Sequence, residues 1–217
     1  MKNVKIAPSI LAADFSQLGE DIQKVAEAGA DLIHFDIMDG HFVPNLTMGV
    51  DLVKAVRRYT DLPFDVHLMV THPQDYIQSF VDVGADLITI HAEIVTAPIS
   101  AVIGKIKSLN ILVGLATRPQ TPISVINPYL PDLDLVLPMS VEPGFGGQKF
   151  MLDTLEKISY IDKKIKEIGK SIDLEVDGGI NEKTAPLVIE RGATILVAGT
   201  AVFKQSNYAD AMSHLRH

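Results

Sequence analysis

The chain has 217 residues, 47% of them hydrophobic, and a formal net charge of −8, with no cysteine. This length suits one well-buried domain over residues 1–217, and the lack of cysteine excludes disulfides, thiolate metal ligands and a thiol nucleophile. The acidic balance argues against a nucleic-acid partner, and no apolar run is long enough to span a membrane. The first residues carry no signal-peptide pattern, so we expect a cytoplasmic protein.

Two periods alternate along the chain: short apolar runs typical of strands, and apolar residues at helical spacing. We expect strands over residues 4–9, 32–38, 64–69, 86–91, 111–116, 134–139, 172–177 and 194–198. We expect helices after a capping Asp14, over 50–56, from 71 to 83, over 98–109, 121–129 and 155–168, after a capping Asn181, and over 207–215. Gly-Ala-Asp or Gly-Ala-Thr precedes the second, fourth and eighth strands, where glycine suits the end of a helix.

Eight successive strand–helix units predict an α/β fold, the single-domain (β/α)8 TIM barrel, because crossover helices make neighbouring strands parallel. The structural alternative is an open doubly wound sheet. We disfavour it because no glycine-rich dinucleotide fingerprint follows the first strand. The barrel also predicts where the chemistry lies, which is at the carboxyl ends of the strands.

Polar side chains interrupt three strands near those ends. His34 and Asp36 share one face of the second strand, His67 lies in the third, and Asp177 ends the seventh. His-x-Asp alone can be a hydrogen-bonded structural pair, but four such residues converging from three strands favour a metal site. Two imidazoles and two carboxylates suit one divalent ion, with zinc preferred and cobalt, manganese or iron as alternatives.

Other residues on the inward faces of these strands have supporting roles in this prediction. Asp65 and Glu175 should lie one layer below the candidate ligands, where they would orient the imidazoles. Met38, Met69 and Met139 should form an apolar wall that keeps water from a reacting group. Ordinary core packing would place the three methionines there as well.

Three glycine-rich segments follow neighbouring strands: Glu-Pro-Gly-Phe-Gly-Gly at 142–147, Asp-Gly-Gly at 177–179 and Gly-Thr at 199–200. Glycine lets backbone N–H groups approach an anion, and the loops after the seventh and eighth strands are the usual phosphate seat of this fold. Together these loops predict a site for a small phosphorylated molecule.

A family resemblance rests on the segments APSILAADF, HFDIMDGHFVPN, HLMV, SVEPGFGGQKF and LEVDGGI. They resemble the signature segments of ribulose-phosphate 3-epimerases, and the resemblance runs from residue 6 to about residue 203. It implies a metal-dependent isomerase that interconverts D-ribulose 5-phosphate and D-xylulose 5-phosphate in the pentose phosphate pathway. It also implies a homo-oligomer and, as partner, a ketose phosphate.

The resemblance also assigns roles to residues. It implies that His34, Asp36, His67 and Asp177 bind the metal, and that Asp36 and Asp177 are the acid/base pair. The residues that it places against substrate are Ser9, His67, Gly144, Phe145, Gly146, Gly147, Asp177, Gly178, Gly179, Gly199 and Thr200. Inverting a carbon next to a ketone needs proton removal on one face and delivery on the other, and two carboxylates suit this. The metal ion would stabilise the cis-enediolate.

Two departures from the family pattern concern Arg118 and Glu142, which we expect to form an ion pair at the barrel mouth. One rival function is epimerisation of a longer sugar such as D-allulose 6-phosphate, which the intact glycine loops disfavour. Another is decarboxylation on the same barrel, which uses a lysine between two aspartates, whereas residues 36–39 contain none. A third is a non-catalytic binding barrel, but no candidate metal ligand is lost.

Overall fold

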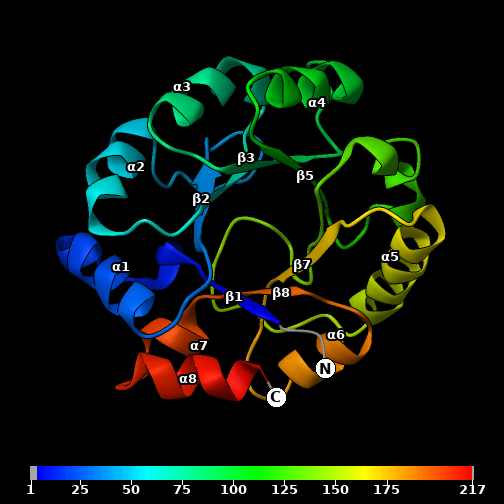
Figure 1. Ribbon diagram of the computed structural model, residues 1–217. Coiled ribbons are helices and arrows are strands. Elements are labelled where there is room, and N and C mark those ends of the chain that lie inside the picture. Colours follow the sequence, from blue (N-terminus) through cyan, green and yellow to red (C-terminus); the bar gives the residue numbers. More distant parts are fainter. Residues whose placement is uncertain (1–3, 217) are drawn as a thin grey trace.

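The computed structural model describes residues 4–216, in which eight parallel strands form a nearly closed barrel surrounded by helices (Figure 1). The strands are β1 (Lys5–Pro8), β2 (Ile33–Met38), β3 (Phe64–Met69), β4 (Leu87–His91), β5 (Leu112–Thr117), β6 (Leu135–Pro138), β7 (Asp173–Asp177) and β8 (Ile195–Ala198). The predicted barrel is therefore confirmed. The single domain predicted over residues 1–217 stays a prediction, and residues 1–3 and 217 lie outside the described residues.

The helices follow the strands along the chain and cover the outside of the barrel, except that only 3-10 helices lie between β5 and β6 (Figure 1). They are α1 (Leu18–Glu27), α2 (Val50–Val56), α3 (Ile77–Asp82), α4 (Ile99–Ser108), α5 (Thr154–Ile168), α6 (Ala185–Glu190), α7 (Thr200–Phe203) and α8 (Tyr208–Leu215). The longest, α5, ends at Gly169, whose φ of 69° is the left-handed conformation that closes a helix and that glycine adopts most readily. No helix within residues 4–216 is both long and apolar enough to cross a membrane.

The helix predicted over residues 121–129 is wrong. The chain there forms two short 3-10 helices, Ile123–Ile126 and Leu130–Asp132. Pro128 explains the difference, because proline lacks the N–H that an α-helix needs and disfavours the helical conformation of the residue before it. Branched side chains at positions 123, 125 and 126 further weaken helix formation.

Three helix starts also differ from the prediction. Asp14 caps a 3-10 helix over Phe15–Gln17, and α1 begins only after it. The side chain of Asn181 accepts the backbone N–H of Lys183, but the residues after it form a turn and α6 starts at Ala185. The helix predicted from residue 71 begins as the 3-10 helix Pro73–Asp75. Asp14 and Asn181 accept backbone N–H groups as caps do, whereas no side chain among residues 4–216 caps the third start, and turns or 3-10 helices precede each α-helix.

A repeated pair of hydrogen bonds joins the strands at the bottom of the barrel, and we call it the strand clasp. The residue just before each even-numbered strand, or two before it for β2, donates its backbone N–H to one residue of the preceding strand. Its side-chain oxygen accepts the N–H of that same residue. The clasps are Asp31 with Ile6, Asp86 with Phe64, Asp134 with Val113, and Thr194 with Leu174. Each clasp fixes the register of two neighbouring strands.

Inside the barrel, polar and apolar side chains come mainly from different strands. Strands β2, β3, β4 and β7 contribute most of the buried polar residues, namely His34, Asp36, Asp65, His67, Thr89, His91 and Glu175, and β5 adds Thr117. A small apolar cluster comes mainly from the other strands and includes Ala7, Ala116, Leu135, Leu137, Ile195 and Val197, together with Leu87 of β4. A larger apolar core, with Phe35, Phe64 and Phe80, includes residues of both the strands and the helices. Each such side chain contributes roughly 1.5–3 kcal/mol, which offsets the cost of the polar interior.

Candidate functional site

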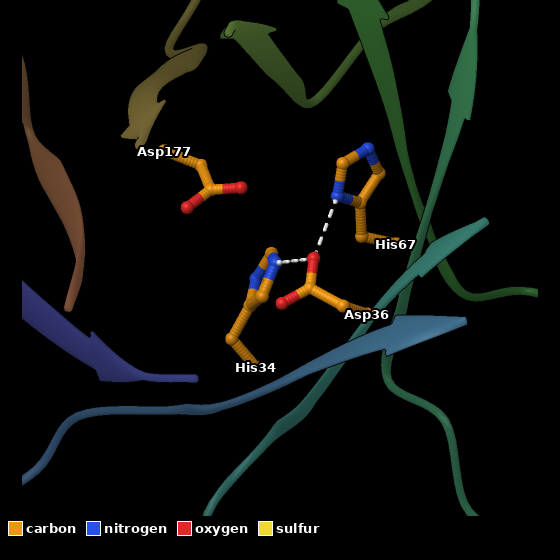
Figure 2. A group of neighbouring side chains, drawn as sticks. All are labelled: His34, Asp36, His67 and Asp177. Atoms are coloured by element: carbon orange, nitrogen blue, oxygen red, sulfur yellow. Dashed lines mark hydrogen bonds and ion pairs between the residues drawn. The ribbon is translucent and has the colours of Figure 1, made fainter. Parts of the chain in front are cut away.

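Two neighbouring strands bring three of the four predicted metal ligands together. The parallel register of β2 and β3 pairs His34 with Asp65 and Asp36 with His67. The Oδ1 atom of Asp36 lies 3.3 Å from Nε2 of His34 and 3.3 Å from Nδ1 of His67 (Figure 2). Its other oxygen, Oδ2, accepts a hydrogen bond of 2.6 Å from the hydroxyl of Ser9. Both oxygens of this carboxylate are therefore held in place.

The layer below supports His34 as the sequence predicts. Its Nδ1 lies 2.5 Å from Oδ2 of Asp65, and both side chains are fully buried. Glu175 is buried beside them, and burial together with the charge of Asp65 raises the pKa of Glu175 well above its usual value. Burial disfavours a charged His34, yet the carboxylates of Asp65 and Asp36 raise its pKa well above its usual value. The carboxylates of Asp36 and Asp65 therefore favour a positive charge at the position of His34.

The arrangement fits a divalent metal ion. Because the carboxylate of Asp65 accepts the Nδ1 hydrogen of His34, loss of the other ring proton to a competing cation would leave a lone pair on Nε2 directed toward Asp36. The separations of 3.3 Å exceed those of charge-assisted hydrogen bonds, about 2.7–2.9 Å. They are close to the distance of about 3.4 Å between neighbouring ligand atoms around a tetrahedral ion with bonds near 2.1 Å. This donor geometry supports a metal-binding role.

Asp177 completes the group from another side of the pocket (Figure 2). Its carboxylate and single atoms of His34, Asp36 and His67 all lie within 4.8 Å of one another. Burial and the charge of Asp36 raise the pKa of Asp177 to about 6. Burial opposes the charge of Asp36 as well, but His34 and His67 hold its pKa well below its usual value. The two carboxyl groups thus differ in their tendency to hold a proton, as an acid and a base must.

A pocket of about 370 Å³ opens above these side chains. Asp36 and most of the residues predicted to contact substrate line it, namely Ser9, Gly144, Phe145, Gly146, Gly147, Asp177, Gly178, Gly179, Gly199 and Thr200. His67 does not line it and lies fully buried below. Gly178 and Gly179 have φ values of 116° and 64°, which glycine adopts without strain. The glycine loops therefore meet along one part of the pocket, as the sequence predicts.

The three methionines also lie where the sequence predicts them. Met38, Met69 and Met139 are at most 3% exposed, and all three line the pocket. Met38 and Met69 are register partners of β2 and β3 and pack with Val43. They give the pocket an apolar wall next to the candidate metal ligands.

The loop after β2 is held over this wall by Asp39. Its carboxylate accepts backbone N–H groups from His41 at 2.8 Å, Phe42 at 2.8 Å and Thr71 at 2.7 Å. Farther along the loop, the side-chain amide of Asn45 donates to the carbonyl of Gly144 at 2.7 Å. The loops after β2 and β6 are thereby joined across the pocket.

We expect Asp39→Asn to weaken folding in a pH-dependent way. Burial opposes ionisation of Asp39, but its three backbone hydrogen bonds lower the pKa from 3.8 to about 2. A lowered pKa stabilises the folded state by about 2 kcal/mol above pH 4, and this contribution is lost as the pH falls toward 2. Urea unfolding of both proteins at several pH values measures it. A stability difference independent of pH between 2 and 6 would contradict this prediction.

Sequence reasoning gave no role to His91, yet it lies directly behind His67. Its Nε2 is 2.9 Å from Nε2 of His67, and its Nδ1 is 3.0 Å from Glu93. Burial lowers the pKa of His91 to about 4. Burial opposes ionisation of Glu93, but hydrogen bonds from His91, Thr121 and Arg118 hold its pKa at about 2. The signal was parity, since His91 shares the inward face of β4 with Thr89, the register partner of His67.

The expected ion pair between Arg118 and Glu142 is wrong. Arg118 donates through its guanidinium to the carbonyl of Phe42 at 2.7 Å and lies 4.5 Å from the centre of that ring. Glu142 is exposed, and none of the ion pairs among residues 4–216 joins it to Arg118. A carbonyl and an aromatic face offered the guanidinium a more buried environment than a solvated carboxylate.

Comparison with known proteins agrees with this geometry. Residues 5–203 match the model of the ribulose-phosphate 3 epimerase family. Ribulose-phosphate 3-epimerase of Bacillus subtilis is 51% identical over 214 residues, which are 98% of this chain and 98% of that protein. The chloroplastic ribulose-5-phosphate-3-epimerase of Arabidopsis thaliana is 45% identical over 215 residues, 99% of this chain and 76% of that protein.

Among solved structures, 3-keto-L-gulonate-6-phosphate decarboxylase of Vibrio cholerae covers 100% of this chain with a TM-score of 0.73. The match spans 96% of that protein, but the sequences are only 14% identical, so this likeness shows the barrel fold alone. The family model and the relatives, by contrast, match in sequence over nearly the whole length. The chain therefore belongs to the ribulose-phosphate 3-epimerase family.

Proposed function

We propose that this protein is a metal-dependent isomerase that interconverts D-ribulose 5-phosphate and D-xylulose 5-phosphate in the pentose phosphate pathway. The observation that carries the proposal is that Asp36 and Asp177 line one pocket and that the imidazoles of His34 and His67 lie beside both carboxylates. Family membership over residues 5–203 supports the choice of reaction.

Two carboxylates on different sides of a pocket can invert a carbon next to a ketone. In one direction, one carboxylate removes the C3 proton, and the other, in its acid form, delivers a proton to the opposite face. In the reverse direction Asp36 and Asp177 exchange these roles. The hydroxyl of Ser9 holds Asp36 in one orientation, and the methionine wall limits the water that could exchange the protons.

The residues that would hold the metal ion are His34, Asp36, His67 and Asp177. Two nitrogen and two oxygen donors favour zinc, with cobalt, manganese or iron as alternatives, whereas magnesium prefers oxygen donors. When bound, the ion would act as a Lewis acid that stabilises the developing enediolate charge by about 3 kcal/mol. Asp65 orients one of these ligands, His34, by accepting a hydrogen bond from its Nδ1 atom.

The glycine loops would hold the phosphate of the sugar, and Gly179→Ala tests this. A Cβ atom at Gly179 would lie 2.6 Å from the backbone nitrogen of Phe150, and its φ of 64° disfavours other residues. We expect KM for the phosphorylated sugar to rise about tenfold, because the loop must shift and its backbone N–H groups would then be misplaced, and losing one hydrogen bond to a charged group weakens binding by about 1.5 kcal/mol. Gly104→Ala in α4 is the control, since a Cβ there meets nothing within 4 Å. An unchanged KM would remove the phosphate assignment.

A decarboxylase function is disfavoured by the side chains between Asp36 and Asp39. These are Ile37 and Met38, and neither can supply the cationic group that such chemistry uses. The decarboxylase among the similar solved structures is related to this chain by fold alone.

The proposal is tested by incubating the purified, zinc-loaded protein with D-ribulose 5-phosphate and following D-xylulose 5-phosphate by NMR. D-Allulose 6-phosphate is assayed in parallel. We expect kcat/KM for the pentose to exceed that for the hexose at least tenfold. Turnover of the hexose alone would keep the mechanism and change the substrate, whereas turnover of neither would refute the proposed function.

Two further properties remain predictions. Family resemblance implies a homo-oligomer, which analytical ultracentrifugation would test. We also expect a cytoplasmic enzyme whose partner is a small ketose phosphate rather than a nucleic acid or a membrane. Fractionation of cells that produce the tagged protein would test its location.

A further inference from the structure

A second buried histidine contacts one of the candidate metal ligands. His91 ends β4 and is fully buried, and its Nε2 atom faces Nε2 of His67 at 2.9 Å. The two rings are inclined by only 20°, with their centres 5.0 Å apart. A nitrogen–nitrogen distance of 2.9 Å requires a hydrogen atom between them, so one imidazole donates and the other accepts.

Glu93 fixes the tautomer of the neutral His91 ring. Its Oε2 lies 3.0 Å from Nδ1 of His91, and a carboxylate can only accept, so His91 carries its hydrogen on Nδ1. A neutral His91 then has a lone pair on Nε2 and accepts from His67. His67 must in turn carry its hydrogen on Nε2. The Nδ1 atom of His67 then carries a lone pair, which faces Oδ1 of Asp36 and is free to bind a metal ion there.

The other oxygen of Glu93 is held by the loop after β5. Its Oε1 accepts the backbone N–H of Arg118 at 2.8 Å and a short hydrogen bond from the hydroxyl of Thr121. Lys157 donates to the carbonyl of Thr121 at 2.6 Å and so fixes that loop to α5. The orientation of Glu93 is therefore set by a backbone and a side-chain donor of this loop, which α5 in turn holds in place.

Phe42 packs against His91 from the loop after β2. The two ring centres are 4.9 Å apart, and the guanidinium of Arg118 lies against the phenyl ring and donates to the carbonyl of Phe42. Rotation of the His91 ring would break this packing as well as both hydrogen bonds. His91 is thus held in one orientation by contacts on several sides.

We propose that His91 and Glu93 are positioning residues that hold His67 in the tautomer whose Nδ1 can bind the metal ion. This inference rests on the proposed function only in that His67 is taken as a ligand. Hydrogen-bonded partners of a metal-binding histidine commonly change metal affinity by 10- to 100-fold. His91 and Glu93 would act on the metal through His67 without touching it.

The test compares His91→Leu, which cannot accept a hydrogen bond, with His91→Gln, whose side-chain oxygen can. The matched control is Thr89→Val, a shape-conserving change two residues earlier on the same inward face of β4, where the hydroxyl makes no hydrogen bond to residues 4–216. We expect cobalt affinity, measured by competition with a chelating dye, to fall 10- to 100-fold in His91→Leu. His91→Gln should recover part of this loss, and Thr89→Val should bind like wild type.

A spectroscopic measurement tests the tautomers directly. Nitrogen-15 NMR of the zinc-loaded full chain should show His91 with hydrogen on Nδ1 and His67 with hydrogen on Nε2. Glu93→Gln gives a second variant that keeps an acceptor oxygen but lacks the charge, so it should fold even if His91→Leu does not. We expect it to lower metal affinity severalfold.

The outcomes separate this inference from the proposed function. Wild type that binds no zinc or cobalt would overturn both. Wild type that binds metal and epimerises the pentose, with His91→Leu indistinguishable from Thr89→Val, would overturn the inference alone. A His91 ring with hydrogen on Nε2 would also overturn it, whatever the activity.

Discussion

Asp177→Asn should lower kcat for epimerisation by about 10²- to 10⁴-fold, because the amide cannot exchange a proton with the sugar. The fold should persist, since asparagine has nearly the same shape and the carboxylate makes no hydrogen bond to described residues that amidation would break. Activity is compared at equal metal content, because Asp177 is also a candidate ligand. Steady-state turnover with elemental analysis of the same sample measures both.

Hydrogen exchange in D₂O makes this test sharper. With Asp177 replaced, Asp36 can still remove the C3 proton of the epimer whose C3–H bond faces Asp36. It can then return deuterium to the same face. The variant should therefore exchange one epimer without inverting it. Asp36→Asn should exchange only the other epimer. If both variants exchanged the same epimer, the two carboxylates could not serve opposite faces.

Removal of divalent metal is expected to have the second large effect. Chelation should lower turnover about 10²- to 10³-fold, the loss associated with removing one strong stabilising group at an oxyanion. It should also lower Tm by about 5–10 °C, because a ligand at 100 times its Kd stabilises the fold by about 2.7 kcal/mol. Differential scanning calorimetry and activity assays on the same chelated samples measure the two effects.

Metal reconstitution supplies the control for this experiment. Zinc, cobalt, manganese or iron should restore both turnover and Tm, since each accepts two imidazoles and two carboxylates. Magnesium should restore neither at similar concentration. Full turnover by protein that elemental analysis shows to be free of metal would contradict the assignment of His34, Asp36, His67 and Asp177.

The parts of the fold and site that follow from periodicity could be predicted from the sequence. Strand parity placed His34 and Asp36 on one face, and the alternation of strands and helices placed Asp177 at the same end of the barrel. Both inferences depend only on the two-residue period of a strand and on parallel strand direction. The meeting of the glycine loops at one pocket followed for the same reason, because parallel strands bring their carboxyl ends to one end of the barrel.

The contacts that could not be predicted depend on register and on long side chains. The contact between His67 and His91 depends on the register of β3 against β4, which no local pattern specifies. The side chain of Arg118 could reach several acceptors, and the one it contacts is a backbone carbonyl of the loop after β2. The helix expected at 121–129 fails for a different reason, because Pro128 prevents a continuous α-helix despite the apolar spacing around it.

The strand clasps divide the barrel into four quarters, each made of an odd strand and the even strand that follows it. At the bottom all four quarters use the same joint, Asp31, Asp86, Asp134 or Thr194 bonded to the preceding strand. At the top they differ completely, because the candidate metal ligands come from the first, second and fourth quarters alone. A chain built by duplicating one such unit would keep the regular joint at one end, while each copy was free to acquire different chemistry at the other. The natural boundaries at which quarters of related barrels could be exchanged therefore lie between the clasps, after β2, β4 and β6.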